Sequence, residues 1–244
     1  MNKALFWDFD GTLVQRGSRP LWSSSLLRAL KESWPDCPCV LEDVRPHLRA
    51  CFPWDTPQEN LTHLTGEAWW AFMRYHFEKA CLALGADGET AGRAAEKVRG
   101  FVLEMQHYTL YEDVLSVLQT MAELGFEQYV VSNNHPDLFP LVEELGLAQY
   151  FSAVIVSGEI GYDKPRREIY ELALQKAGNP GFCYMIGDNP YADGEGAQNA
   201  GITPLLVHLK QPAEGFLCFD TLFHAAQYIQ EELHAATQYD HRGL

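Results

Sequence analysis

The segment ALFWDFDGTLV, residues 4–14, joins a run of apolar residues to two carboxylates and a turn. Residues 4–10 predict a buried β-strand, and Gly11-Thr12 predicts the turn that follows it. Because strand side chains alternate between two faces, Asp8 and Asp10 are expected on the same face. Two carboxylates a few ångströms apart repel each other and disfavour joint ionisation. The pair therefore indicates a bound proton, a bound cation or a catalytic role at the end of this strand.

Alternating strand and helix patterns fill the chain from residue 109 onward. Strands are predicted over residues 128–132, 153–157, 182–187 and 203–208, with helical patterns between them and a last helix over 220–234. Strands that alternate with helices indicate a parallel sheet with crossover connections. The apolar strands are typical of a sheet that is buried on both faces. We therefore predict an α/β protein with a Rossmann-like parallel sheet and helices on both faces.

The region between the first strand and residue 109 has helical periodicity instead. Its clearest segment is TGEAWWAFMRYHFEKACLALG, residues 65–85, in which apolar and aromatic residues recur at helical spacing. No strand pattern interrupts the region. We predict an inserted all-helical cap domain over residues 15–108 and an α/β catalytic core made of residues 1–14 and 109–244.

The charge balance argues against two classes of partner. The chain has 244 residues, with 18 Lys and Arg against 33 Asp and Glu, and a formal net charge of -15. Nucleic-acid and membrane-surface binding both favour basic patches, and no Lys/Arg run is present, so we expect neither partner. The N-terminal sequence lacks the apolar core of a signal peptide, and no apolar run reaches the length of a membrane span. We therefore expect a cytoplasmic protein.

One cluster of cysteines allows two interpretations. Cys37, Cys39 and Cys51, with His47, could supply four zinc ligands. The C-x-C spacing departs from the usual C-x₂₋₄-C pattern of zinc sites. We prefer the alternative that these cysteines are buried, reduced thiols in the helical region.

Polar residues follow four of the predicted strands. In an open parallel sheet the carboxyl ends of the strands form the ligand-binding edge. Carboxylates without cysteine or histidine favour a hard cation, Mg²⁺ above all, and a lysine at a helix start favours an anion. Together these groups predict phosphoryl transfer. The residues concerned are Asp8, Asp10, Ser132, Asn133, Lys164, Asp188 and Asp193.

The same residues form four short motifs that resemble those of the haloacid dehalogenase superfamily, in its phosphatase branch. The resemblance covers residues 1–14 and about 109–210, and the inserted region matches the family's helical cap only in position and helicity. Arg166-Arg167 and Asn189-Pro190 depart from the usual pattern without removing a chemically necessary group. The motifs are D-x-D-G-T at Asp8, Asp10, Gly11 and Thr12, Ser132 in VVSNN, Lys164-Pro165, and G-D-x₄-D at Gly187, Asp188 and Asp193.

The resemblance implies a Mg²⁺-dependent phosphatase that hydrolyses a small phosphorylated metabolite, a phosphomonoester, through an aspartyl-phosphate. Asp8 would be the nucleophile, and Asp10 would protonate the leaving oxygen and then activate water. Ser132 and Lys164 would bind the transferring phosphoryl group. The Mg²⁺ ion would be held by Asp8, the carbonyl of Asp10 and Asp188, with Asp193 close by.

Other residues near the predicted site are candidate substrate contacts. Those near the strand ends are Thr12, Asn133, Arg16 and Arg19, with His135 as a further candidate or a surface turn residue. An aromatic lining from the cap is the other possibility, although helical aromatic residues more often fill a core. The residues of that lining would be Trp69, Trp70, Phe72, Tyr75 and Phe77.

Three functions stay open on the sequence: a phosphatase, a phosphomutase or phosphotransferase, and a non-catalytic binding protein. A dehalogenase has no leaving oxygen to protonate, so Asp10 favours a phosphatase or a phosphomutase. A phosphomutase or phosphotransferase would use the same scaffold to return the phosphoryl group to a sugar. A non-catalytic binding protein with the same fold would be expected to lack one of the acidic groups, and none is missing.

Overall fold

The computed structural model describes residues 2–15 and 21–240 and confirms the α/β prediction. Six strands form one parallel sheet in the order β3-β2-β1-β4-β5-β6, so the first strand lies in the interior of the sheet. The short outer strand β6 had no counterpart in the sequence prediction, because three residues are too few to show an alternating pattern. The strands are β1 (Lys3–Trp7), β2 (Glu127–Ser132), β3 (Ala153–Val156), β4 (Phe182–Gly187), β5 (Thr203–Val207) and β6 (Leu217–Phe219).

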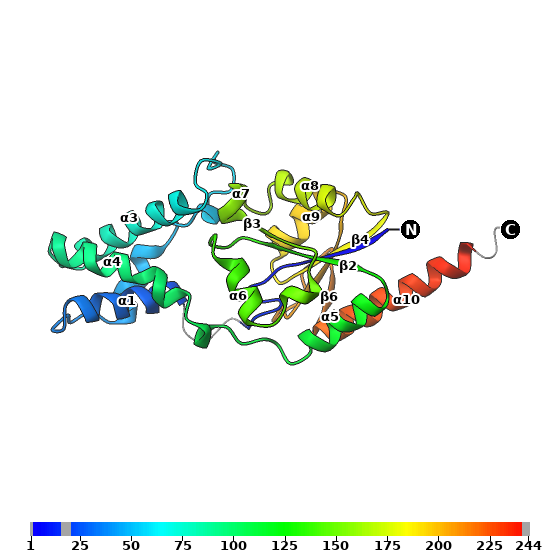
Figure 1. The fold of residues 1–244 in the computed structure, drawn as a ribbon, viewed down its shortest axis with the longest axis horizontal. Coiled ribbons are helices and arrows are strands. Elements are labelled where there is room, and N and C mark those ends of the chain that lie inside the picture. The colour runs from blue at the N-terminus through cyan, green and yellow to red at the C-terminus, as the bar shows by residue number, and fades with distance from the viewer. Residues whose placement is uncertain (1, 16–20, 241–244) are drawn as a thin grey trace.

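Helices cover both faces of the sheet, as predicted (Figure 1). Alternate residues of β1 enter different hydrophobic clusters: Leu5 and Trp7 pack with one set of helices, and Ala4 and Phe6 with the other. This alternation is the period of a strand buried on both sides. The first face is covered by α5 (Val114–Glu123), α6 (Leu138–Glu144) and α10 (Leu222–Asp240), and the second by α8 (Arg167–Lys176) and α9 (Gly196–Asn199).

The inserted region is helical and has a hydrophobic cluster of its own, which includes Leu26, Trp69, Met73 and Val98. We call this region the cap. Figure 1 shows its helices to one side of the sheet, beyond the edge on which β1 ends. The cap helices are α1 (Leu21–Ser33), α2 (Leu41–Val44), α3 (Glu67–Ala83) and α4 (Gly88–Val102).

The two chain segments that join the cap to the sheet lie side by side. Val14 and Leu110 form an antiparallel bridge, and the Gln15 N–H donates to the Thr109 carbonyl at 2.8 Å. The predicted boundaries at residues 14/15 and 108/109 fall at this pair of connections. The division into two domains stays a prediction.

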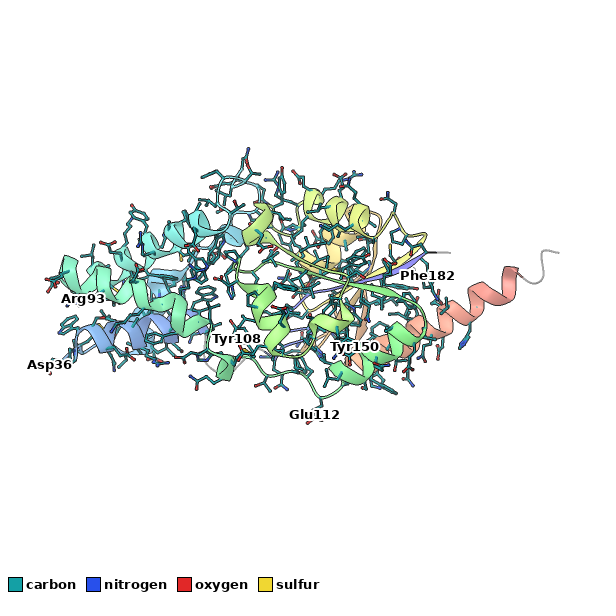
Figure 2. All side chains as sticks on the ribbon, viewed as in Figure 1. Asp36, Arg93, Tyr108, Glu112, Tyr150 and Phe182 are labelled. Atoms are coloured by element: carbon teal, nitrogen blue, oxygen red, sulfur yellow. The ribbon has the colours of Figure 1, made fainter. Side chains whose placement is uncertain are left out.

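All six strands run toward the cap. Figure 2 labels Phe182, the first residue of β4, at the end of the sheet away from the cap, and Tyr108 at the junction between the two parts. Because the strands are parallel, their carboxyl ends all face the cap. The ligand-binding edge of the sheet is therefore the edge that the cap covers.

A charged group on the core holds the cap at this junction. The Asp137 carboxylate, just before α6, accepts a hydrogen bond from Trp70 Nε1 at 2.6 Å and two from Arg99, at 2.9 and 3.0 Å. Trp70 and Arg99 belong to α3 and α4, so one core carboxylate ties together two cap helices. The Arg99 guanidinium also lies 5.1 Å from the Trp70 ring centroid.

Two further expectations concern the cap cysteines and membranes. Cys37, Cys39 and Cys51 are buried, whereas His47 is exposed, and among the described residues no group of three or more possible metal ligands includes any of them. Burial raises the pKa of the Cys51 thiol to about 11, which disfavours the thiolate that zinc needs.

Across the described part of the chain, no helix combines the length and apolarity needed to cross a bilayer.

The contacts of Asp137 predict a selective loss of stability. Asp137→Ala should lower the free energy of unfolding by about 1–3 kcal/mol, because the buried Trp70 N–H and the Arg99 guanidinium lose their shared acceptor. Urea denaturation measures this. Glu67→Ala is the matched control, since Glu67 pairs with the same Arg99 but belongs to the cap and has an exposed side chain. Equal losses in the two variants would contradict a special role for Asp137.

Candidate active site

The site begins where β1 ends. The Asp8 N–H continues the pairing with β4 by donating to the Ile186 carbonyl at 2.9 Å, and the chain then turns at Gly11, whose φ is +88°. Phe9 is fully buried in the core, while Asp8 and Asp10 both line a cavity between the sheet and the cap. The predicted common orientation of the two carboxylates is therefore present, although the regular strand stops at Trp7 rather than at Asp10.

A buried lysine bridges two of the predicted carboxylates. Lys164 Nζ lies 2.7 Å from Asp8 Oδ1 and 2.6 Å from Asp193 Oδ1. Burial alone would lower the pKa of Lys164, but the charges of Asp193 and Asp8 overcome this and hold its pKa above the usual value. The ammonium group therefore stays charged. Lys164, predicted at the start of a helix, lies just ahead of α8, which begins at Arg167.

Asp193 owes its position to the loop after β4. Residues Pro190–Glu195 form a π-helical turn, and the Asn189 side chain accepts from the Tyr191 and Ala192 N–H groups at its start. The Asp193 carboxylate is fully buried, and it packs where a side chain on Gly187 would stand: a Cβ there would lie 2.2 Å from Asp193 Cγ. Burial raises the pKa of Asp193 to about 7, against the opposing effect of Lys164.

Three carboxylates form a candidate metal centre. Asp8, Asp188 and Asp193 each offer an oxygen atom, and these atoms all lie within 4.8 Å of one another. The three carboxylates and the Lys164 ammonium leave a formal excess of two negative charges, which one divalent cation balances. An all-oxygen donor set fits Mg²⁺. The contribution predicted for the Asp10 carbonyl stays a prediction.

The residues at the carboxyl end of β2 orient groups that follow β1 and precede α8. Ser132 Oγ donates to Asp8 Oδ1 at 3.0 Å. Asn133 accepts from the Lys164 N–H at 2.6 Å and donates to the Lys164 carbonyl at 2.9 Å. Both ends of the Asn133 amide thus hold the Lys164 backbone, and Asn133 also lines the cavity, so its predicted substrate contact stays a prediction.

Asn134 is a site residue for which the sequence motifs predict no role. Its Nδ2 donates to Asp10 Oδ2 at 2.8 Å, which fixes the orientation of the carboxylate predicted to act as the acid. Its position in the run Ser132-Asn133-Asn134 at a strand end is the signal that could have found it.

The remaining predicted substrate contacts near the strand ends are Thr12, Arg16 and Arg19. Thr12 is fully buried and is not among the residues that line the cavity. Arg16 and Arg19 lie outside the described residues. Neither expectation gains support from the structure.

The aromatic residues of α3 mostly fill the cap core, the alternative favoured for helical aromatic residues, and none of them lines the cavity. Trp69, Trp70 and Phe77 are buried in the cap cluster, Phe72 packs against it, and Tyr75 is exposed. The cavity is lined by other aromatic residues of the cap, Trp22, Phe52 and Trp54 among them. Helical periodicity shows that α3 has an apolar face, but it does not show what that face meets.

His135 is buried rather than in a surface turn. It is 1% exposed, it packs against the rings of Trp22, Trp69 and Trp70, and neither ring nitrogen has a hydrogen-bond partner among the described groups. Burial lowers the pKa of His135 to about 4. It is therefore a neutral side chain at the junction of cap and core, and it is not among the residues that line the cavity.

The comparison with known families agrees with this geometry. The model of the haloacid dehalogenase-like hydrolase family matches residues 2–201. The chain belongs to this family. The four motifs lie at one edge of the sheet, as the family match leads us to expect. The chain is a haloacid dehalogenase-like hydrolase with a helical insertion after its first strand.

Two curated relatives of this hydrolase are named as phosphatases. The phosphoserine phosphatase of Thermus thermophilus is 36% identical over 129 residues, and the match spans about half of each protein, 51% of this chain and 51% of the relative. The phosphoglycolate phosphatase of Rhodobacter capsulatus is 29% identical over 239 residues, which are 93% of each chain.

Solved structures show the same fold. A 2-haloacid dehalogenase from Pseudomonas syringae superposes on this hydrolase with a TM-score of 0.69 and 20% identity, over 96% of this chain and 100% of that one. At 20% identity this likeness shows the fold alone.

The carboxylate cluster predicts stabilisation by Mg²⁺. Saturating Mg²⁺, at about 100 times its Kd, should raise the free energy of unfolding by about 2.7 kcal/mol. Asp188→Asn should remove most of this Mg²⁺-dependent increment, since one of three clustered ligands is lost. Thermal denaturation with Mg²⁺ and with EDTA measures it. Asp36→Asn, at the far end of the cap, should leave the increment unchanged (Figure 2), and an increment that survives Asp188→Asn would count against the assigned ligands.

The burial of His135 predicts a loss of stability in acid. The pKa of His135 is about 4 in the folded chain, against 6.5 for the free side chain, so the unfolded chain takes up a proton first as the pH falls. Stability should fall by roughly 2–3 kcal/mol between pH 6.5 and 4 from this group. His135→Phe should flatten that part of the profile of unfolding free energy against pH. His47→Gln, on the exposed cap surface, is the control, and an unchanged slope in His135→Phe would refute the assignment.

Proposed function

We propose that this hydrolase is a Mg²⁺-dependent phosphatase that hydrolyses a small phosphomonoester through an aspartyl-phosphate. The observation that carries the proposal is the placement of Asp8, Asp10 and Lys164 around one cavity, with Asp8 in contact with both Ser132 and Lys164. This arrangement supplies a nucleophile, a separate acid and a fixed positive charge.

In the first step an oxygen of Asp8 forms a bond to phosphorus and the bond from phosphorus to the leaving oxygen breaks. Asp10 gives its proton to that leaving oxygen, so the alcohol departs neutral. The hydrogen bond from Asn134 aims the Asp10 carboxyl, and the two donors Ser132 and Lys164 orient Asp8.

In the second step water attacks phosphorus, Asp10 takes the proton of that water, and the bond from phosphorus to Asp8 breaks. Inorganic phosphate leaves, and both carboxylates return to their starting states. In this proposal Lys164 and Ser132 bind the oxygens of the transferring group, and the cap over the sheet edge keeps bulk water away. When bound by Asp8, Asp188 and Asp193, Mg²⁺ supplies positive charge that offsets the negative charge of the phosphoryl group.

The named activities of two relatives support this class of reaction, since the phosphoserine and phosphoglycolate phosphatases both act on phosphomonoesters by name. Asp10 supports it further, because a dehalogenase reaction has no leaving oxygen that needs a proton.

The first test is phosphate release from a panel of phosphomonoesters with Mg²⁺ or EDTA. We expect release that requires Mg²⁺ and is abolished in Asp8→Asn while the circular dichroism spectrum stays that of the folded chain. Isomerised sugar phosphate without net phosphate release would instead identify a mutase. Chloride release from 2-chloropropionate, with no phosphate release, would identify a dehalogenase.

A second test separates the roles of the two carboxylates. Asp10→Asn should lower kcat by about 10²–10⁴-fold for an alkyl phosphate, whose leaving oxygen needs the proton. The loss should be much smaller for the first step with p-nitrophenyl phosphate, because nitrophenolate leaves without protonation, and a burst of nitrophenol should remain. Equal losses in the rate of the first step for the two substrates, measured by rapid quench, would contradict the role of Asp10 as an acid.

A further inference from the structure

The cavity above Asp8 has a wall of aromatic side chains. Its volume is about 650 Å³, within the range of roughly 300–1,000 Å³ typical of sites for ligands much larger than phosphate. The two catalytic carboxylates and Lys164 lie on the sheet side. The lining side chains that carry aromatic carbon rings are Trp22, Phe52, Trp54, Tyr108 and Tyr191.

Three of these rings form one connected group. Phe52 and Trp54 stack with a centroid distance of 4.8 Å and an interplanar angle of 6°. Trp22 lies 5.1 Å from the Phe52 centroid at 55°. Trp22 and Trp54 are half-buried, so each keeps accessible surface within the lining of the cavity.

The segment that carries Phe52 and Trp54 forms a turn closed by its own hydrogen bonds. The Phe52 N–H donates to Asp55 Oδ2 at 3.0 Å, and the Asp55 N–H returns a bond to the Phe52 carbonyl at 2.9 Å. The cap loop that follows is fastened to the core, since Arg166 Nη1 donates to the Glu59 carbonyl at 3.1 Å. These bonds order the segment before a ligand binds, which lowers the entropy cost of using its rings.

Two charged side chains accompany the rings. Arg45 and Asp55 both line the cavity and both are exposed. An exposed guanidinium and a carboxylate offer donors and acceptors to the edge of a planar group whose face lies on the rings. A leaving group of two or three carbons would fill little of this space and would leave the aromatic wall in water.

We infer that the substrate is a phosphomonoester whose leaving group carries a planar aromatic ring, and that Trp54 with Trp22 and Phe52 selects it. This inference rests on the proposed phosphatase activity and adds the chemical class of its substrate. Two sources offer this chemistry: nucleoside 5′-monophosphates, which have a hydrogen-bonding edge that Arg45 and Asp55 can meet, and aryl phosphates such as phosphotyrosine.

The test compares kcat/KM for ring-bearing and aliphatic substrates with Mg²⁺. The ring-bearing set is uridine and guanosine 5′-monophosphate and phosphotyrosine, and the aliphatic set is phosphoserine, phosphoglycolate and glycerol 3-phosphate. We expect at least a tenfold preference for a member of the first set. Arg45→Gln then separates the sources, because it should weaken nucleotide turnover and leave phosphotyrosine turnover little changed.

Trp54→Ala should lower kcat/KM for the preferred ring-bearing substrate by roughly 5- to 100-fold, mainly through KM, as expected for the loss of one stacking contact. The ratio of ring-bearing to aliphatic activity should fall with it. Trp54→Phe should restore much of that ratio. Tyr75→Ala, which removes an exposed aromatic ring from the outer surface of the same cap, is the matched control and should leave the ratio unchanged.

A binding measurement separates failure of this inference from failure of the proposed function. In the Asp8→Asn background with Mg²⁺, calorimetry should show that uridine 5′-monophosphate or phosphotyrosine binds more tightly than phosphoserine, and that Trp54→Ala removes the difference. Turnover of aliphatic phosphates with no effect of Trp54→Ala on the ratio would overturn the ring-binding inference and leave the phosphatase intact. No turnover of any phosphomonoester would overturn the proposed function itself.

Discussion

The ammonium group of Lys164 is the centre on which the rest of the site depends. It is buried and lies within 2.7 Å of two carboxylates from segments far apart in the chain, Asp8 after β1 and Asp193 after β4. Removing one partner of such a buried ionic group typically costs about 3–5 kcal/mol, because the remaining charge has no water to stabilise it. The fold must therefore keep both carboxylates within hydrogen-bonding distance of the Lys164 ammonium.

Much of the surrounding structure maintains this contact. The Asn133 amide hydrogen-bonds to both the N–H and the carbonyl of Lys164. Gly187 has no side chain, which leaves room for the Asp193 carboxylate. Because β1 lies between β2 and β4, the groups that follow all three strands meet at one edge. The single ammonium does not neutralise the carboxylates around it, which is why the same edge suits a divalent cation.

The cap adds a different kind of constraint. Asp137 ties α3 and α4 to the core, and Arg166 fastens the cap loop near Glu59. The aromatic group of Trp22, Phe52 and Trp54 lines the same cavity as the catalytic groups. The chemistry of the site thus comes from the sheet edge, whereas the shape that a substrate meets comes largely from the cap.

The sequence by itself determined the class of fold and the polar residues at the strand ends, because strand periodicity and spacing are local and each motif lies within a few residues. It also placed the helical insertion after the first strand. Only the tertiary structure decided which side chains meet: that Asn134 holds Asp10, that Thr12 is buried away from the cavity, and that Trp54 rather than Trp69 lines it. The physical reason is that periodicity shows which face of an element is apolar, while the partner of that face depends on packing between segments far apart in the chain.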